Sequence, residues 1–81
     1  MIDQLRLQID GLDKAILFLL EYRFAVCEKI GSWKKENNIQ SIQDPAREAQ
    51  IIQTLSEYSK YDGMVEKIWP VIMEYSRSLQ K

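Results

Sequence analysis

Histidine is absent from the chain, and cysteine occurs only once, at Cys27. A single cysteine cannot form an intrachain disulfide. Without histidine, the common zinc sites and the Ser-His and Cys-His nucleophilic systems are excluded. We therefore interpret Cys27 as a buried packing thiol and not as a nucleophile. Any chemistry has to come from Arg, Lys, Asp, Glu, Gln, Ser and Tyr side chains.

The chain also lacks a charge excess and a long apolar run. Eleven Lys and Arg residues stand against twelve Asp and Glu residues, for a formal net charge of -1. A protein that binds nucleic acid or an anionic membrane would carry a net basic surface. No apolar run reaches the roughly 18 residues that a membrane span needs, and we expect no signal peptide. We expect a cytoplasmic protein with one domain over residues 1–81, since this length allows no second core.

Glycine and proline are scarce, with three and two residues, and the apolar residues recur at helical spacing. Steps of three and four residues predict a first amphipathic helix from about Ile2 to Asn37, where Asn37-Asn38 is the first strong stop. The apolar stripe of this helix comprises Leu5, Ile9, Leu12, Ile16, Leu19, Val26, Ile30 and Trp33.

Asp44-Pro45 predicts the start of a second helix after a loop over Ile39–Gln43, because Asp is a good N-cap and Pro fits the first turn. This helix should end near Glu57. Its apolar side comprises Ile51, Ile52 and Leu55.

A break at Ser59–Gly63 predicts a third helix from about Asp62 or Met64 to Leu79. Pro70 lies inside it and is expected to kink it or to free one carbonyl. Its apolar stripe comprises Val65, Ile68, Trp69, Ile72 and Leu79. The fold class predicted for the chain is therefore all-α, with three helices.

The first predicted helix is too long for a compact chain of this size. At about 1.5 Å per residue it spans roughly 50 Å, whereas a compact globule of this length has a diameter near ~30 Å. Because the apolar stripe runs along the whole helix, something outside the chain has to cover it. We expect a second copy, in an antiparallel homodimer with two-fold symmetry. A coiled-coil segment that binds another protein is the alternative.

Two cations share the apolar face of the first predicted helix. Arg23 continues the series Leu19, Arg23, Val26, and Lys34 lies three helical turns farther along on nearly the same face. A buried cation is costly unless an anion meets it. Alternatively, the aliphatic stems pack while the charged heads reach water.

The other two helices also carry polar residues on their apolar faces. Glu48 shares a face of the second helix with Ile52, and Arg47 is the adjacent residue. Alternatively, Glu48 lies in the first turn only because a carboxylate there interacts favourably with the helix dipole. Ser76 and Gln80 continue the stripe of the third helix. These polar side chains, namely an excess of cations with a carboxylate, a hydroxyl and an amide, would face the interior of a helix bundle. They predict a site for an anionic ligand. Planar Arg side chains suit a ligand that carries carboxylates or phosphates.

Several short motifs follow one another along nearly the whole chain. They are Leu5-Arg6 and Ile9 followed by Leu12-Asp13, Arg23 after a run of leucines, Ile30-Gly31 followed by Lys34, Asp44-Pro45-Ala46-Arg47-Glu48, and Ile72, Ser76 and Gln80. In order and spacing they resemble the all-helical chorismate mutases, over nearly the whole chain. That family converts chorismate to prephenate, in the route to phenylalanine and tyrosine, without a metal or a cofactor. Its fold is an intertwined dimer of three-helix chains.

The resemblance implies a role for eight residues. Arg6, Arg23 and Arg47 would hold the two carboxylates of chorismate, with Ser76 assisting, and Arg6 would come from the partner subunit. Glu48 and the Asp44 region would contact the ring hydroxyl. Lys34 and Gln80 would donate hydrogen bonds to the ether oxygen. The residues expected to act in catalysis are Lys34, Gln80, Glu48 and Arg23.

Two other functions remain open at this point. Isochorismate-pyruvate lyases resemble the mutases and use a similar cationic pocket, but they lack the acidic residue that matches Glu48. A non-catalytic helical module, for regulation or dimerisation, would be expected to have lost one or more of Arg23, Lys34, Glu48 and Gln80, and all four are present.

Overall fold

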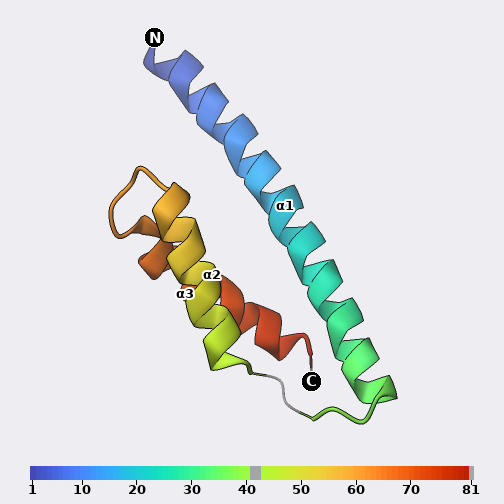
Figure 1. The fold of residues 1–81 in the computed structure, drawn as a ribbon. Helices are drawn as coiled ribbons and strands as arrows, with labels where there is room; N and C mark the ends of the chain where they lie inside the picture. The colour runs from blue at the N-terminus through green and yellow to red at the C-terminus, as the bar shows by residue number, and fades with distance from the viewer. Residues whose placement is uncertain (41–42, 81) are drawn as a thin grey trace.

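Three helices make up the described part of the chain. The computed structural model describes residues 1–40 and 43–80. It contains α1 (Ile2–Glu36), α2 (Pro45–Tyr58) and α3 (Met64–Ser78), and no strand in these residues (Figure 1). The prediction of an all-α chain with a long N-terminal helix is confirmed. Ser41 and Ile42, in the middle of the predicted loop, lie outside the described residues.

Local hydrogen bonds define the end of α1 and the start of α2. Nδ2 of Asn37 donates to the carbonyl oxygen of Trp33 at 2.8 Å, and Asn38 has a φ of 59°, a left-handed conformation that asparagine tolerates. Asp44 caps α2 as predicted, because its Oδ1 accepts a hydrogen bond from the backbone N–H of Arg47 at 3.1 Å.

The start of α3 depends on glycine. Gly63 precedes the helix with a φ of 79°, which glycine adopts without steric cost. Pro70 lies within α3, and the helix continues through it to Ser78. A kink or a freed carbonyl at Pro70 stays a prediction.

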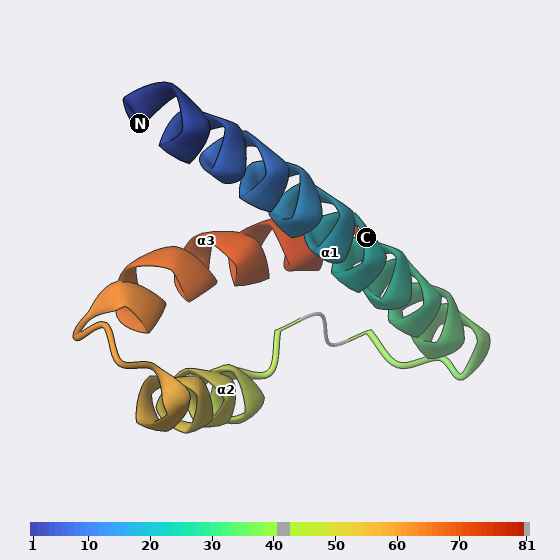
Figure 2. The ribbon, with the colours of Figure 1, turned by 90° about the horizontal axis from the view of Figure 1, so that it is seen from above.

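The third helix connects the other two. Figure 2 shows α3 running from beside α2, at its N-terminal end, to α1 at its C-terminal end. On the α2 side, Oγ of Ser56 donates to a carboxylate oxygen of Glu66. On the α1 side, the rings of Phe24 and Tyr75 pack with their centroids 4.8 Å apart and their planes tilted by 55°.

The face of α1 that α3 covers lies beside the predicted apolar stripe. Cys27 and Gly31 are buried, and Leu20, Phe24 and Lys34 are half-buried, at spacings of four and three residues. Cys27 is buried, as the sequence predicted. The C-terminal part of the stripe stays exposed, namely Leu19, Val26, Ile30 and Trp33.

In α3 the buried positions differ in part from the predicted stripe. Val65 is buried as expected, with 2% of its surface exposed, but Ile68 is exposed. Met73, which the predicted stripe does not include, is buried, with 3% of its surface exposed. The buried residues of α3 are therefore Val65, Met73 and Ser76.

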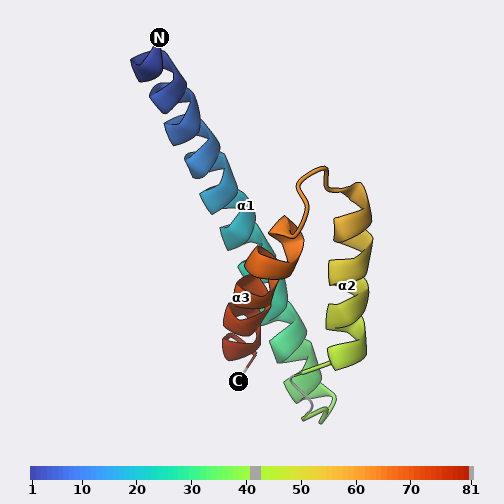
Figure 3. The same cartoon turned by 90° about the vertical axis from the view of Figure 1, so that its left-hand side faces the viewer.

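Much of α1 is exposed in the described chain, since residues 2–19 are all exposed. The described chain measures 55 × 23 × 15 Å and has a radius of gyration of 15.8 Å, against about 12 Å for a compact chain of this length. Figures 1 and 3 show the N-terminal half of α1 extending beyond α2 and α3. Besides the stripe, Leu7, Leu17 and Phe18 are exposed there. The apolar surface of α1 is thus largely uncovered within one chain.

Among the described residues, no helix is long and apolar enough to cross a membrane.

Candidate functional site

A cavity of about 560 Å³ opens where the C-terminal half of α1, the start of α2 and the end of α3 meet. This volume lies within the range of roughly 300–1,000 Å³ that is typical of small-molecule sites. The apolar part of its lining comes from Leu19, Tyr22, Val26, Cys27, Ile30, Ile51 and Met73. Its polar lining consists of Arg23, Lys34, Asp44, Arg47, Glu48, Ser76, Arg77 and Gln80.

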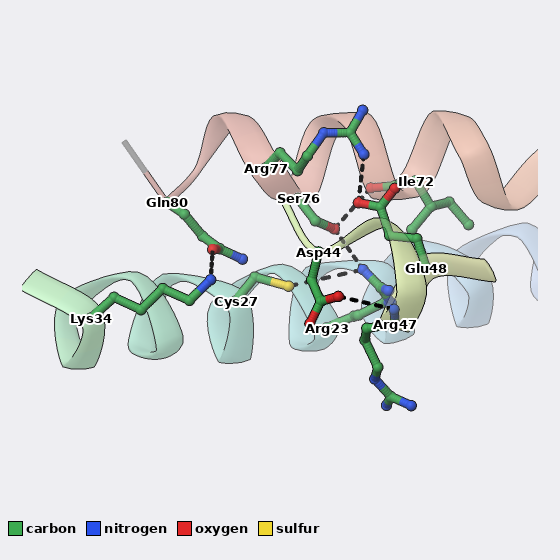
Figure 4. A network of polar contacts seen from close by, with 10 residues as sticks. All are labelled: Arg23, Cys27, Lys34, Asp44, Arg47, Glu48, Ile72, Ser76, Arg77 and Gln80. Carbon is green, nitrogen blue, oxygen red and sulfur yellow. Dashed lines mark hydrogen bonds and ion pairs between the residues drawn. The ribbon is translucent and has the colours of Figure 1, made fainter. Parts of the chain in front are cut away.

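Arg23 is held in this cavity from two sides. Its Nη1 donates to Oγ of Ser76 at 2.5 Å and lies 3.8 Å from Sγ of Cys27 (Figure 4). Ser76 is buried, and its hydroxyl in turn donates to the carbonyl oxygen of Ile72 at 2.8 Å. A guanidinium has five N–H groups, so donors of Arg23 beyond Nη1 remain for a ligand.

Lys34 and Gln80 form a second pair across α1 and α3. Nζ of Lys34 donates to Oε1 of Gln80 at 3.0 Å. An ammonium group can only donate, so it fixes the amide with its oxygen toward the lysine and its Nε2 away from it. Lys34 keeps further N–H donors as well. The pair therefore offers two neighbouring sets of donors to one acceptor atom of a ligand.

The approach of α3 to α1 at this pair depends on Gly31. A Cβ atom built on Gly31 would lie 2.9 Å from Cα of Gln80, which is closer than real Cβ contacts occur. The obstacle is backbone, which cannot rotate away as a side chain can. Gly31 therefore lets the end of α3 come close enough to α1 for Gln80 to reach Lys34.

The α2 side of the cavity carries both acidic and basic side chains. Glu48 is half-buried, and its Oε2 accepts a hydrogen bond from Nη1 of Arg77 at 2.6 Å, so the two form an ion pair between α2 and α3. Arg47 is exposed, and among the described residues the hydrogen bond of its guanidinium goes to Oε1 of Gln50 on its own helix, at 3.0 Å. Asp44 is exposed and is occupied by the cap of α2. Unlike Arg23 and Arg77, Arg47 is therefore exposed and is hydrogen-bonded within its own helix.

The cationic side chains that line the cavity outnumber the anionic ones. Four cations, Arg23, Lys34, Arg47 and Arg77, meet two carboxylates, Asp44 and Glu48. In the part of the chain that the structure describes, no group of His, Cys, Asp and Glu residues could hold a metal ion. The arrangement therefore suits a small ligand with more than one negative charge, bound by hydrogen bonds from fixed donors.

The sequence profile of the family described as chorismate mutase type II matches residues 5–81. The chain belongs to this family. No curated protein and no solved structure gives a significant match.

Seven of the eight residues that the sequence suggested for a chorismate site line the one cavity, and Arg6 does not. Arg6 is exposed, near the start of α1. It precedes Arg23 by 17 residues, and on one helix this separates their backbones by roughly 25 Å. Arg6 therefore cannot reach this cavity from the same chain.

Arg77 lines the cavity, and sequence reasoning missed it. It lies one position beyond Ser76 and therefore about 100° away from the apolar stripe on which the other residues of α3 were chosen. The available signal was its charge, opposite to that of Glu48. Charge alone does not show which of several carboxylates a cation meets, since that depends on how α3 crosses α2.

We expect Gly31→Ala to destabilise this member of the chorismate mutase type II family. Alanine is better than glycine in a helix interior by about 1 kcal/mol, but the collision with the backbone of Gln80 should cost about 1–3 kcal/mol. The control is Gly11→Ala on the same helix, where a Cβ meets nothing within 4 Å. Thermal unfolding should give a lower midpoint for Gly31→Ala than for Gly11→Ala. Equal midpoints would show that α3 does not approach Gly31 this closely.

Proposed function

We propose that this chain is a cytoplasmic chorismate mutase, an isomerase that rearranges chorismate to prephenate. One observation carries the proposal. In a chain of the chorismate mutase type II family, Arg23 with Ser76, Lys34 with Gln80, and Glu48 face one cavity from three helices. Chorismate is a dianion with a ring hydroxyl and an ether oxygen, so each of these groups has a matching partner on the substrate.

The two carboxylates would be bound by arginine. Arg23 is preorganised by its contacts with Ser76 and Cys27, and Arg47 is free to close onto the second carboxylate. Arginine presents parallel N–H donors that match a carboxylate. Arg6 of a second subunit would complete the set.

The ether oxygen would be bound by Lys34 and Gln80. In the rearrangement the C–O bond to this oxygen breaks as a C–C bond forms, and negative charge grows on the oxygen. Nε2 of Gln80 and a remaining N–H of Lys34 are available as donors because the pair is held by the bond from Nζ to Oε1. Donors fixed in advance stabilise developing charge without reorganisation at the moment of reaction.

Glu48 and the Asp44 region would contact the ring hydroxyl. The carboxylate of Glu48 faces the cavity from the first turn of α2, and Asp44 caps the same turn. A hydroxyl held at the ring, together with two bound carboxylates, would fix the enolpyruvyl arm over the ring. That conformer is scarce in water, and holding a near-attack geometry supplies part of the rate. No general acid or base is required.

Incubation of the purified protein with chorismate tests the proposal. Loss of the diene absorbance with formation of prephenate is the expected result. Turnover of isochorismate with release of pyruvate would instead identify a lyase. A folded protein that changes neither compound would identify a non-catalytic helical module.

We expect Glu48→Ala to lower kcat/KM by roughly 10- to 150-fold, which corresponds to the loss of one hydrogen bond to a charged group. Glu57→Ala is the matched control, because Glu57 lies on the same helix, is exposed and does not line the cavity. Initial rates over a range of chorismate concentrations give the comparison. If both variants keep the kcat/KM of the unmodified protein, Glu48 does not contact the substrate.

The proposed enzyme is an intertwined, antiparallel homodimer. The support is the uncovered apolar surface of α1, where residues of the stripe from Leu5 to Leu19 are all exposed within one chain. Burying such a stripe contributes about 25 cal/mol per Å², and two-fold pairing of identical stripes is the simplest closed arrangement. Each α1 would then supply the missing cover for the other.

We expect sedimentation at micromolar concentration to give about twice the chain mass, and Leu12→Glu to abolish the dimer together with much of the helical signal in circular dichroism. In a monomer, a change at exposed Leu12 would alter the unfolding free energy by only about 0.5 kcal/mol. Lys14→Gln, about 200° farther round the helix, changes the net charge equally and should keep the dimer. A stable, fully active monomer would contradict the proposal.

The proposed dimer would form each active site from two chains. If the two-fold axis crosses α1 between Lys14 and Ala15, antiparallel pairing would bring Arg6 of one subunit beside Arg23 of the other. This is consistent with the exposure of Arg6 and its absence from the cavity of its own chain.

A subunit-mixing experiment tests the shared site. Arg6→Ala and Arg23→Ala should each be nearly inactive, but in a mixed dimer one site receives both changes and the other none. With random exchange, activity should recover to about a quarter of the unmodified level. Arg47→Ala is a second partner for Arg6→Ala, because the hydrogen bond of the Arg47 guanidinium in the described chain is to Gln50 of its own helix. Confirmed exchange without recovery would mean that Arg6 is not a ligand across the subunits, and the shared site would be ruled out.

A further inference from the structure

Arg77 makes the one cross-helix ion pair found in the cavity among the described residues. Its Nη1 lies 2.6 Å from Oε2 of Glu48, and the two side chains are 28% and 23% exposed. It comes from the last turn of α3, directly after buried Ser76 and three residues before Gln80. The segment from Ser76 to Gln80, which forms hydrogen bonds with Arg23 and Lys34, thus also binds Glu48.

The contact restricts the carboxylate of Glu48. A carboxylate has two oxygens that accept hydrogen bonds, and a short bond from a guanidinium to one of them fixes the plane of the group. Within the described chain no hydrogen bond engages Oε1 of Glu48. With Oε2 bound by Arg77, Oε1 is the oxygen that remains for a ligand hydroxyl.

The pair also keeps Glu48 away from the other cations. Arg23 and Arg47 line the same cavity and are the residues that would bind substrate carboxylates. Without Arg77, the cations left in the cavity to compensate the charge of Glu48 would be these two arginines and Lys34. An ion pair of that kind would remove a donor that the substrate needs.

The orientation of Arg77 favours this indirect role over direct binding. Figure 4 shows the guanidinium with one terminal nitrogen on Glu48 and the other pointing away from Arg23, Ser76 and Lys34. A residue that held a substrate carboxylate in common with Arg23 would direct its free donors toward that group.

We propose that Arg77 is a positioning residue for the rearrangement, which holds Oε2 of Glu48 so that Oε1 can accept the hydrogen bond of the ring hydroxyl. The inference rests on the proposed function, because it assigns the ligand of Glu48 as the substrate.

A double-mutant cycle in the full chain tests the role. Arg77→Gln should lower kcat/KM on the order of tenfold in the unmodified background, and by less than about twofold when Glu48→Ala is already present. A residue that binds substrate directly would cause the same loss in both backgrounds. That additive result would overturn the proposal, as would an unchanged kcat/KM for Arg77→Gln.

Two controls separate this role from net charge and from folding. Lys67→Gln removes one positive charge from α3 outside the cavity and should leave kcat/KM unchanged, whereas an equal loss would mean that Arg77 acts only by long-range attraction. If Arg77→Gln does not fold, the cycle is made with Arg77→Lys, whose loss should likewise disappear in Glu48→Ala. A loss that persists there would overturn the proposal.

An unmodified protein without mutase activity would overturn the proposed function and this role with it. An active protein with an additive cycle would overturn this role alone.

Discussion

The close approach of the end of α3 to α1 at Gly31 is the constraint on which the rest of the site depends. Gly31 has no side chain, so the backbone of Gln80 can lie against it, and that contact determines how far the last turns of α3 reach across α1. At this distance Ser76 meets Arg23 and Gln80 meets Lys34. A wider gap between these helices would break both contacts and leave Arg23 and Lys34 without their partners from the end of the chain.

Each polar contact in the cavity leaves a hydrogen-bond donor or acceptor of the same side chain available to a ligand. Arg23 uses one nitrogen on Ser76 and Cys27, Gln80 uses its oxygen on Lys34, and Glu48 uses one oxygen on Arg77. The remaining donors and the remaining acceptor are held in known orientations by bonds to neighbouring helices. For a reaction that needs positioning and charge stabilisation but no proton transfer, such preorganisation is the main contribution a protein can make.

The same chain that orders its cavity so closely leaves most of its longest helix without cover. The small core around Val65 and Met73 joins α3 to its neighbours, while residues 2–19 of α1 are all exposed in the described chain. In the proposed dimer these two features are linked, because the uncovered half of one α1 would carry Arg6 to the cavity of the other subunit. Stability and activity would then depend on the same interface, which is a natural solution for a chain of this length.

Local signals in the sequence determined the helices. Asn37-Asn38, Asp44-Pro45 and Gly63 act over a few residues through capping, turn geometry and backbone freedom, so their effect can be predicted without any knowledge of the fold. The order and spacing of the motifs were sufficient to indicate the family, and seven of the eight residues they suggested line one cavity. Only the tertiary structure decided which side of α1 is covered by α3 and that Met73 is buried. It also decided that position 31 needs glycine and that Arg77 pairs with Glu48. The reason is that helical periodicity identifies which residues share a face, whereas the partner of that face depends on the distance and angle at which two helices cross.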